Sequence, residues 1–197
     1  KKDDLPDNEQ RYYLSEIARE FFTAKGYNAI GIDHFALPRD GLSQANETKH
    51  LKRNFQGYTD DNAATLIGVG ASAISHFPQG YVQNAPATSV YQERIDREGL
   101  AGHKGYLMSD QDKLIAYMVE NLMCYFKLDK SELLQKFPTE EVFIDQTMTH
   151  LKYRFPSSFI HGADYLKLRF YAEPLVRIVA KQIDTFASEK AAHSSAI

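Results

Sequence analysis

The strongest constraint on the fold is a polar, aromatic-bearing loop that runs directly into a short apolar segment with two glycines. The loop covers residues 52–59, and a strand is expected over Thr65–Gly70. Because glycine has no Cβ, Gly68 and Gly70 allow a ligand or another backbone to come close. A second expected strand, Asn28–Asp33, also ends in polar groups. Two such strands predict an α/β sheet with a site along one rim.

The remaining pattern predicts mostly helices. Apolar residues at three- and four-residue steps indicate a helix over residues 11–25, which Gly26 ends. Ser109 is the strongest candidate for a helix N-cap, so we expect a domain boundary just before it and domains 1–108 and 109–197. Further helices are expected at 42–51, 89–98, 109–126, 129–137, 140–153 and from Pro174 onward, with Ser89 and Thr139 as caps. We also expect a β-hairpin at 159–168, an extended segment around Tyr106 and a loop at 77–88. Residues 188–197 are expected to fray.

The composition of the chain limits the classes of function that it can have. The chain has 197 residues, of which 43% are hydrophobic and 25% charged, and its net charge is −3. This charge provides no long-range attraction to nucleic acid or to anionic membranes, and no apolar run approaches the ~20 residues of a membrane span. We expect no secretory signal, and the single cysteine, Cys124, suits a reducing cytoplasm.

Four separate motifs, in matching order and spacing, carry a resemblance to a known family. The motifs are Ile32-Asp33-His34-Phe35-Ala36, Arg53-Asn54-Phe55-Gln56-Gly57-Tyr58-Thr59, Gly70-Ala71-Ser72-Ala73-Ile74-Ser75 and Tyr81-Val82-Gln83-Asn84. With them, the chain resembles the oxygen-independent coproporphyrinogen III oxidases, which belong to the radical S-adenosylmethionine enzymes. The similarity continues through residues 122–126 to the C-terminal helix, and it covers only the C-terminal part of such an enzyme.

The resemblance implies a fold and an activity. Residues 1–108 would be the C-terminal portion of an incomplete (β/α) barrel, and residues 109–197 a small, mostly helical, winged-helix-like domain. The intact enzyme would cleave S-adenosylmethionine reductively at a [4Fe–4S] cluster, using a reducing electron donor. The resulting radical takes hydrogen from a substrate propionate, and loss of carbon dioxide and an electron leaves a vinyl group. Two rounds convert coproporphyrinogen III into protoporphyrinogen IX. We expect a monomer in the cytoplasm.

The chain lacks the cysteines that such a cluster needs. Iron–sulfur clusters are held by several thiolates, whereas this chain has one cysteine. The family's closely spaced cysteine motif is therefore missing, so we expect the fragment alone to be inactive. No catalytic residue is assigned within it, and the scattered histidines show no metal-ligand spacing.

The expected cofactor contacts lie in the glycine-bearing segment. By resemblance, Ile74 contacts S-adenosylmethionine at the adenine end, where a β-branched side chain provides a rigid apolar wall. The alternative is that Ile74 is a core residue at a strand end. Gly68 and Gly70 are candidates for close ligand approach, and close packing of two backbones explains them equally well.

The expected substrate contacts lie in the polar loop and beside the earlier strand. Coproporphyrinogen III bears four propionates, and arginine can hold a carboxylate through two parallel hydrogen bonds. We therefore expect Arg53, with Gln56 or Tyr58, to orient the substrate, although a solvated basic helix end is the other interpretation. Asp33 and His34 are candidates for proton exchange or for a hydrogen-bonded structural pair.

Two other functions are weighed against the oxidase. The related haem chaperones replace the Arg-Asn-Phe-Gln-Gly-Tyr segment and carry a histidine in place of Ser-Ala-Ile, so residues 53–58 and 72–74 favour the oxidase. A winged-helix nucleic-acid module would present a basic surface, but residues 109–197 have nearly balanced charges.

Overall fold

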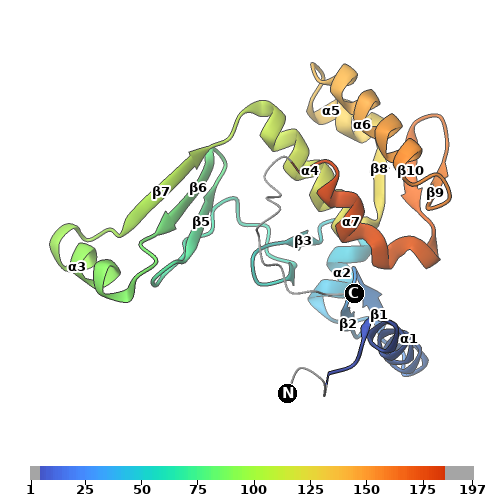
Figure 1. The fold of residues 1–197 in the computed structure, drawn as a ribbon, viewed down its shortest axis with the longest axis horizontal. Coiled ribbons are helices and arrows are strands. Elements are labelled where there is room, and N and C mark those ends of the chain that lie inside the picture. The colour runs from blue at the N-terminus through green and yellow to red at the C-terminus, as the bar shows by residue number, and fades with distance from the viewer. Residues whose placement is uncertain (1–4, 185–197) are drawn as a thin grey trace. The chain divides into compact units, whose positions relative to one another are not determined.

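The structure is a computed structural model that describes residues 5–184, and it contains both helices and strands (Figure 1). The chain divides into two compact units. The first combines the residues up to Asp61 with those from Leu114 onward, and the second is Asn62–Lys113. The domains 1–108 and 109–197 expected from the sequence differ from these units and stay a prediction. The fraying expected at 188–197 lies outside the described residues.

The first unit begins with a capped helix and a hairpin. Helix α1 (Asn8–Ala24) starts at Asp7, whose carboxylate accepts from the Gln10 backbone in a reciprocal capping box. The expected strand 28–33 is instead a hairpin of β1 (Asn28–Ile30) and β2 (His34–Ala36), paired antiparallel. The turn forms because Gly31 adopts φ +56°, which side-chain-bearing residues rarely tolerate.

The rest of the first unit is helical around small antiparallel sheets. The order of the three-stranded sheet is β8-β10-β9, which confirms the hairpin expected at 159–168 and adds a strand that the sequence did not predict. A helix starts directly after Asp129, close to the expected position, and the Asp129 carboxylate caps it by accepting from the backbone N–H groups of Ser131 and Glu132. Thr139 is not the cap that was expected, because the next helix starts one residue later, after Glu140. The elements are α2 (Gly41–Glu47), β3 (Lys52–Arg53), β4 (Tyr58–Thr59), α4 (Asp110–Tyr125), β8 (Lys127–Asp129), α5 (Lys130–Lys136), α6 (Glu141–Arg154), β9 (Phe159–His161), β10 (Tyr165–Leu168), η2 (Phe170–Leu175) and α7 (Val176–Lys181).

Two hydrophobic clusters stabilise this unit. The larger joins the apolar side of α4 to β8, α6, β10 and α7, with Leu122 and Leu166 fully buried. The smaller packs Ile30, Leu51 and Tyr58 against Cys124 near the end of α4. The smaller cluster positions the site, because it holds the β1–β2 hairpin and the loop before β4 on the same helix.

The second unit is a three-stranded antiparallel sheet, in the order β5-β6-β7, with one helix (Figure 1). The strand expected at Thr65–Gly70 is wrong, since only Leu66 forms a bridge there, with His76. The loop expected at 77–88 is also wrong, because this range contains a complete five-residue strand, β6. The elements are β5 (Ile74–Phe77), β6 (Gly80–Asn84), α3 (Thr88–Glu98) and β7 (Gly102–Leu107). The cap expected at Ser89 is wrong, because α3 starts at Thr88 and has no side-chain cap. Strand β7 confirms the extended segment expected around Tyr106.

The two glycine-bearing stretches do not form the common sheet that the sequence predicted. Strand β1 pairs only with β2, and the sheet of the second unit contains β5, β6 and β7. Every strand pair among residues 5–184 is antiparallel. A mixed α/β architecture is confirmed, and the barrel stays a prediction.

Candidate functional site

The turn between β1 and β2 carries the first pair of candidate residues. The His34 Nδ1 atom lies 2.8 Å from Asp33 Oδ1. An ionised carboxylate only accepts hydrogen bonds, so this contact requires the proton on Nδ1. Both side chains are accessible, 55% for Asp33 and 40% for His34. The pair is therefore hydrogen-bonded and still open to a second partner.

The polar loop between β3 and β4 is folded around one asparagine. The Asn54 side-chain oxygen accepts from the backbone N–H groups of Gln56, at 2.8 Å, and of Gly57, at 3.2 Å. The Asn54 backbone N–H donates to the Gly57 carbonyl at 2.9 Å. Asparagine favours such turns because its side chain can mimic the backbone. The turn leaves the side chains of Arg53 and Gln56 exposed.

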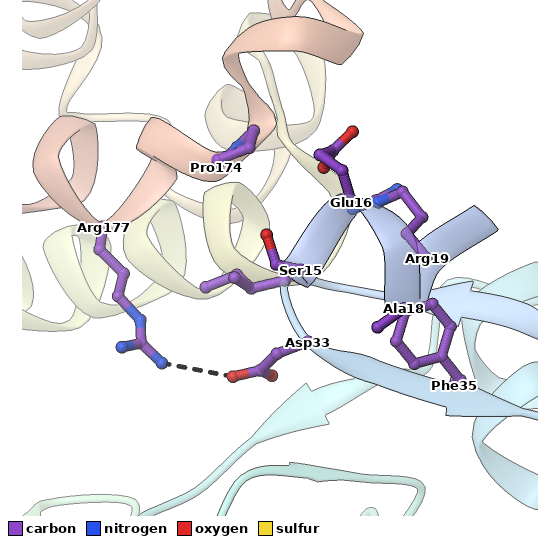
Figure 2. Close-up of a pocket in the computed structure, with 9 residues that line it drawn as sticks. Ser15, Glu16, Ala18, Arg19, Asp33, Phe35, Pro174 and Arg177 are labelled. Carbon is purple, nitrogen blue, oxygen red and sulfur yellow. Dashed lines mark ion pairs between the residues drawn. The ribbon is translucent and has the colours of Figure 1, made fainter. Parts of the chain in front are cut away.

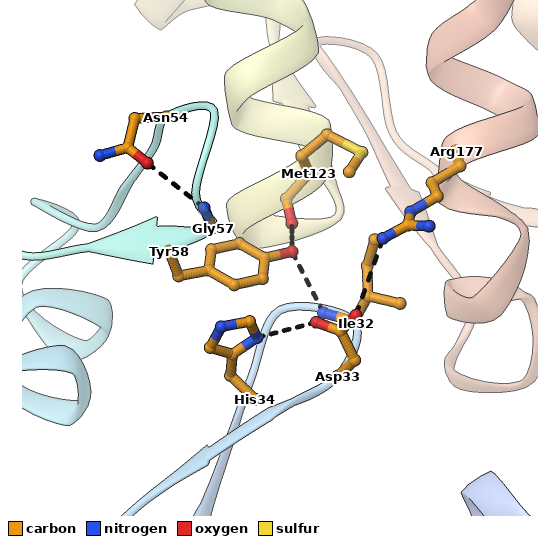
Figure 3. A network of polar contacts seen from close by, with 8 residues as sticks. All are labelled: Ile32, Asp33, His34, Asn54, Gly57, Tyr58, Met123 and Arg177. Carbon is orange, nitrogen blue, oxygen red and sulfur yellow. Dashed lines mark hydrogen bonds and ion pairs between the residues drawn. The ribbon is translucent and has the colours of Figure 1, made fainter. Parts of the chain in front are cut away.

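Tyr58 joins this loop to the hairpin and to α4 (Figure 3). Its hydroxyl accepts from the Ile32 N–H at 3.1 Å and donates to the Met123 carbonyl at 2.7 Å. Only 8% of Tyr58 is exposed, and burial raises the pKa of its hydroxyl to about 12, although the Ile32 hydrogen bond acts in the opposite direction. The hydroxyl is thus occupied by backbone groups.

Arg53 lies against the same ring and keeps its polar end accessible. Its guanidinium carbon is 5.6 Å from the centre of the Tyr58 ring, within cation–π distance. The ring supports the arginine, whose side chain is exposed. A guanidinium held in this way can receive a carboxylate.

Arg177, on α7, is a member of the site that the sequence did not point to. Its Nη2 atom lies 3.7 Å from Asp33 Oδ2, so the carboxylate has Arg177 on one oxygen and His34 on the other (Figure 3). The residues are 144 positions apart, and no local pattern signals such a pair. At this distance between accessible groups, the ion pair contributes about 1 kcal/mol or less.

A cavity of about 200 Å³ adjoins this pair (Figure 2). Arg19 of α1 and Arg177 contribute positive charge, and Glu16 and Asp33 contribute negative charge. Arg19 is also 3.9 Å from Glu173. The formal charges of the lining side chains cancel, so the cavity does not by itself select anions.

The expected cofactor residues belong to the second unit. Ile74 is half-buried at the start of β5. Gly68 packs so closely on it that an added Cβ would lie 2.7 Å from the Ile74 carbonyl oxygen. Gly70 has φ +110° and open space around it. The Asn84 side-chain amide donates to the carbonyls of both glycines at 3.0 Å. Close backbone packing explains Gly68, and contacts of these residues with a ligand stay a prediction.

Metal ligands do not gather in the described part of the chain. Among residues 5–184, no group of three or more His, Cys, Asp or Glu side chains is placed to hold a metal ion. Cys124 is buried, and burial raises the pKa of its thiol to about 12, which opposes the thiolate that metals require. No helix among these residues is long and apolar enough to cross a membrane.

Comparison with known proteins identifies the relatives. The chain is 41% identical over 193 residues to the oxygen-independent coproporphyrinogen III oxidase of Paracoccus denitrificans. That alignment covers 98% of this chain and 43% of the relative. The chain is homologous to one part of the oxygen-independent coproporphyrinogen III oxidases. No protein-family model matches it.

Two further comparisons agree. The oxygen-independent coproporphyrinogen III oxidase of Escherichia coli is 31% identical over 192 residues, which is 95% of this chain and 42% of that protein. The solved structure of coproporphyrinogen III oxidase from Escherichia coli, a radical SAM enzyme, matches with a TM-score of 0.85 at 29% identity. It covers 94% of this chain and 43% of the solved one. This chain thus spans about two fifths of the length of these relatives.

Proposed function

We propose that this chain is the part of an oxygen-independent coproporphyrinogen III oxidase that orients the porphyrinogen substrate and contributes a contact to S-adenosylmethionine. The observation that carries the proposal is the 41% identity over 98% of the chain to an oxidase of this name. The TM-score of 0.85 to the Escherichia coli enzyme supports the same assignment. The intact protein would act in the cytoplasm with coproporphyrinogen III and a reducing electron donor.

The residues present do not fit an iron–sulfur cluster. A [4Fe–4S] cluster needs several thiolates, and the chain has one cysteine, which is buried. The cluster ligands of the proposed oxidase must therefore come from outside these 197 residues. By itself the chain would bind and orient molecules without performing the redox step.

The substrate side is built on Arg53. Its accessible guanidinium can form two parallel hydrogen bonds to a propionate, and the exposed amide of Gln56 adds donors from the same turn. Asp33 and His34 add accessible groups that can accept or exchange a proton. Tyr58 does not fit the direct contact that the sequence suggested for it, because its hydroxyl already bridges two backbone groups.

The cofactor side is built on Ile74. The half-buried isoleucine presents an apolar surface at the start of β5, which suits one face of an adenine ring. S-adenosylmethionine, when bound, supplies the radical chemistry of the reaction. The role of this chain is to hold the molecules, to orient them and to exclude competing reactions.

A binding titration tests the substrate assignment. The intact protein is titrated with coproporphyrinogen III under anaerobic conditions and, separately, with haem. We expect Arg53→Ala to weaken porphyrinogen binding by at least about ten-fold, since a charge-assisted bond is worth about 1.5–3 kcal/mol. Lys49→Ala is the matched control, because it removes an equal charge from the same basic segment but from a side chain already paired with Glu132 at 3.0 Å.

The outcomes separate the candidate functions. Loss of affinity in Arg53→Ala but not in Lys49→Ala supports the proposal. Equal binding by both variants refutes the role of Arg53. Tight haem binding by a protein that ignores the porphyrinogen would favour a haem chaperone.

A further inference from the structure

The hydroxyl of Tyr58 connects two distant segments of the first unit. It lies between the Ile32 N–H and the Met123 carbonyl, on segments 26 and 65 positions away in the sequence. Met123 is in the last turn of α4, where helix carbonyls lack intrahelical partners. One hydroxyl therefore satisfies a helix end and a turn amide at the same time.

The surrounding backbone packs closely against the Tyr58 ring. A Cβ on Gly31 would lie 2.0 Å from the ring carbon that bears the hydroxyl. The His34 ring stands edge-on to the Tyr58 ring, with centroids 5.0 Å apart and planes at 83°. A Cβ on Gly57 would come within 3.2 Å of His34 Nε2. A side chain at Gly31 therefore has no room beside the ring, and one at Gly57 would require the imidazole to shift by a few tenths of an ångström.

The same turn carries the candidate acid–base pair. Ile32, whose N–H the hydroxyl holds, directly precedes Asp33 in the chain. Asp33 binds His34 Nδ1 at 2.8 Å, and Arg177 lies on its other oxygen. Figure 3 shows the bridged Ile32 N–H directly before the Asp33 carboxylate that contacts the imidazole, so a shift of the backbone at Ile32 would move that carboxylate.

We propose that Tyr58 is a positioning residue: its hydroxyl bridge fixes the 31–34 turn, so that Asp33 holds His34 in one orientation toward the substrate. This inference rests on the proposed function for its catalytic consequence, whereas the bridge itself does not. Tyr58 acts through Asp33 and touches no substrate. It differs from Arg53, whose exposed side chain lies against the same ring.

The test compares Tyr58→Phe with Tyr125→Phe in the intact protein. Both substitutions keep an aromatic ring and remove a hydroxyl that donates to a backbone carbonyl, Met123 or Leu51. Both tyrosines belong to the same small hydrophobic cluster. Only Tyr58→Phe also releases the Ile32 N–H. The measurements are hydrogen exchange at the Ile32 amide, kcat, and the dissociation constant for coproporphyrinogen III.

For Tyr58→Phe we expect about ten-fold faster exchange at Ile32, the factor that corresponds to one lost hydrogen bond. We expect kcat to fall about ten-fold with little change in the dissociation constant. Tyr125→Phe should leave Ile32 exchange, kcat and the dissociation constant unchanged. Unchanged Ile32 exchange in Tyr58→Phe overturns the bridge, and a weakened dissociation constant with unchanged kcat shows a substrate contact instead.

A second variant tests whether Tyr58 acts through the carboxylate. Asp33→Asn leaves the bridge in place, so Ile32 exchange should stay at the wild-type rate while kcat falls. The double variant should be no slower than Asp33→Asn, since residues that act through one another are not additive. A multiplicative loss in the double variant overturns the proposal. If the wild-type protein has no oxidase activity but Ile32 exchange responds as expected, the proposed function fails and the bridge stands.

Discussion

Replacing Gly31 by alanine is the most severe small change that the first unit offers. Gly31 has φ +56°, and a Cβ there would meet the Tyr58 ring carbon at 2.0 Å and its hydroxyl at 2.1 Å. These atoms belong to a buried ring whose hydroxyl is held on two sides. The methyl group can be accommodated only if the ring or the turn moves.

Two costs add up at this position. Forcing an alanine into a left-handed conformation costs about 1–2 kcal/mol. Displacing the tyrosine leaves the Ile32 N–H and the Met123 carbonyl without their partner, at about 1–3 kcal/mol each. The sum is roughly 3–8 kcal/mol, a large share of the about 5–15 kcal/mol that stabilises a typical domain.

Gly26 separates the two costs. It also has a positive φ, +84°, but an added Cβ would meet nothing within 4 Å. Gly26→Ala should therefore lower the free energy of unfolding by the conformational cost alone, about 1–2 kcal/mol.

The assay is urea unfolding of the 197-residue chain, followed by far-ultraviolet circular dichroism because the chain has no tryptophan. We expect Gly31→Ala to lose at least about 2 kcal/mol more than Gly26→Ala, the minimum for two unpaired backbone groups. Effects at distant sites usually add to within about 0.5 kcal/mol. If the free energies of unfolding of the two variants fall by the same amount within that margin, the close packing of Gly31 on Tyr58 is refuted.

Two further predictions concern buried groups whose pKa is raised in the folded chain. The pKa of Tyr58 is raised from 10.0 to about 12 by folding, so the protonated hydroxyl contributes its full stabilisation below about pH 10, and this contribution is lost as the pH rises toward about 12. Tyr58→Phe should therefore reduce the fall in the free energy of unfolding between about pH 10 and 12, and an unchanged slope in urea titrations would contradict this. The thiol of Cys124 is buried with its pKa raised to about 12, so iodoacetamide should alkylate it slowly in buffer near pH 8 and rapidly in urea, and equal rates measured by mass spectrometry would show that it is not buried.

Local chemistry allowed the sequence to predict several elements. The helix that starts near Asp129 and the hairpin of β9 and β10 follow from residues that are neighbours in the chain. Strand β6 was not predicted because Gly80 and the nearby prolines are residues typical of loops. Those residues mark the ends of the strand, and its pairing with β5 and β7 supplies the stabilisation.

The candidate site was predictable only in part. Asp33, His34, Arg53 and Tyr58 are candidates from their motifs, and the structure brings all four together in one unit. The sequence did not reveal which of them is buried, so the inward role of the Tyr58 hydroxyl was not predicted. Its partner, the Met123 carbonyl, is a backbone group, and every residue has one.

Arg177 was missed for a different reason. From the sequence, an arginine in a short C-terminal helix is expected to be a solvent-exposed charge. Its pairing with Asp33 depends on how that helix packs. The identity of the relatives does not reveal this contact either. It comes from tertiary structure alone.

Anaerobic turnover of the intact protein tests the central assignment most directly. Coproporphyrinogen III, S-adenosylmethionine and a reductant are supplied, and the tetrapyrrole product and carbon dioxide are measured. We expect protoporphyrinogen IX with two carbon dioxide molecules for each substrate consumed, and none from the 197-residue chain alone, because it has a single cysteine. An intact protein that holds its cluster and binds S-adenosylmethionine but releases no carbon dioxide from this substrate would contradict the account.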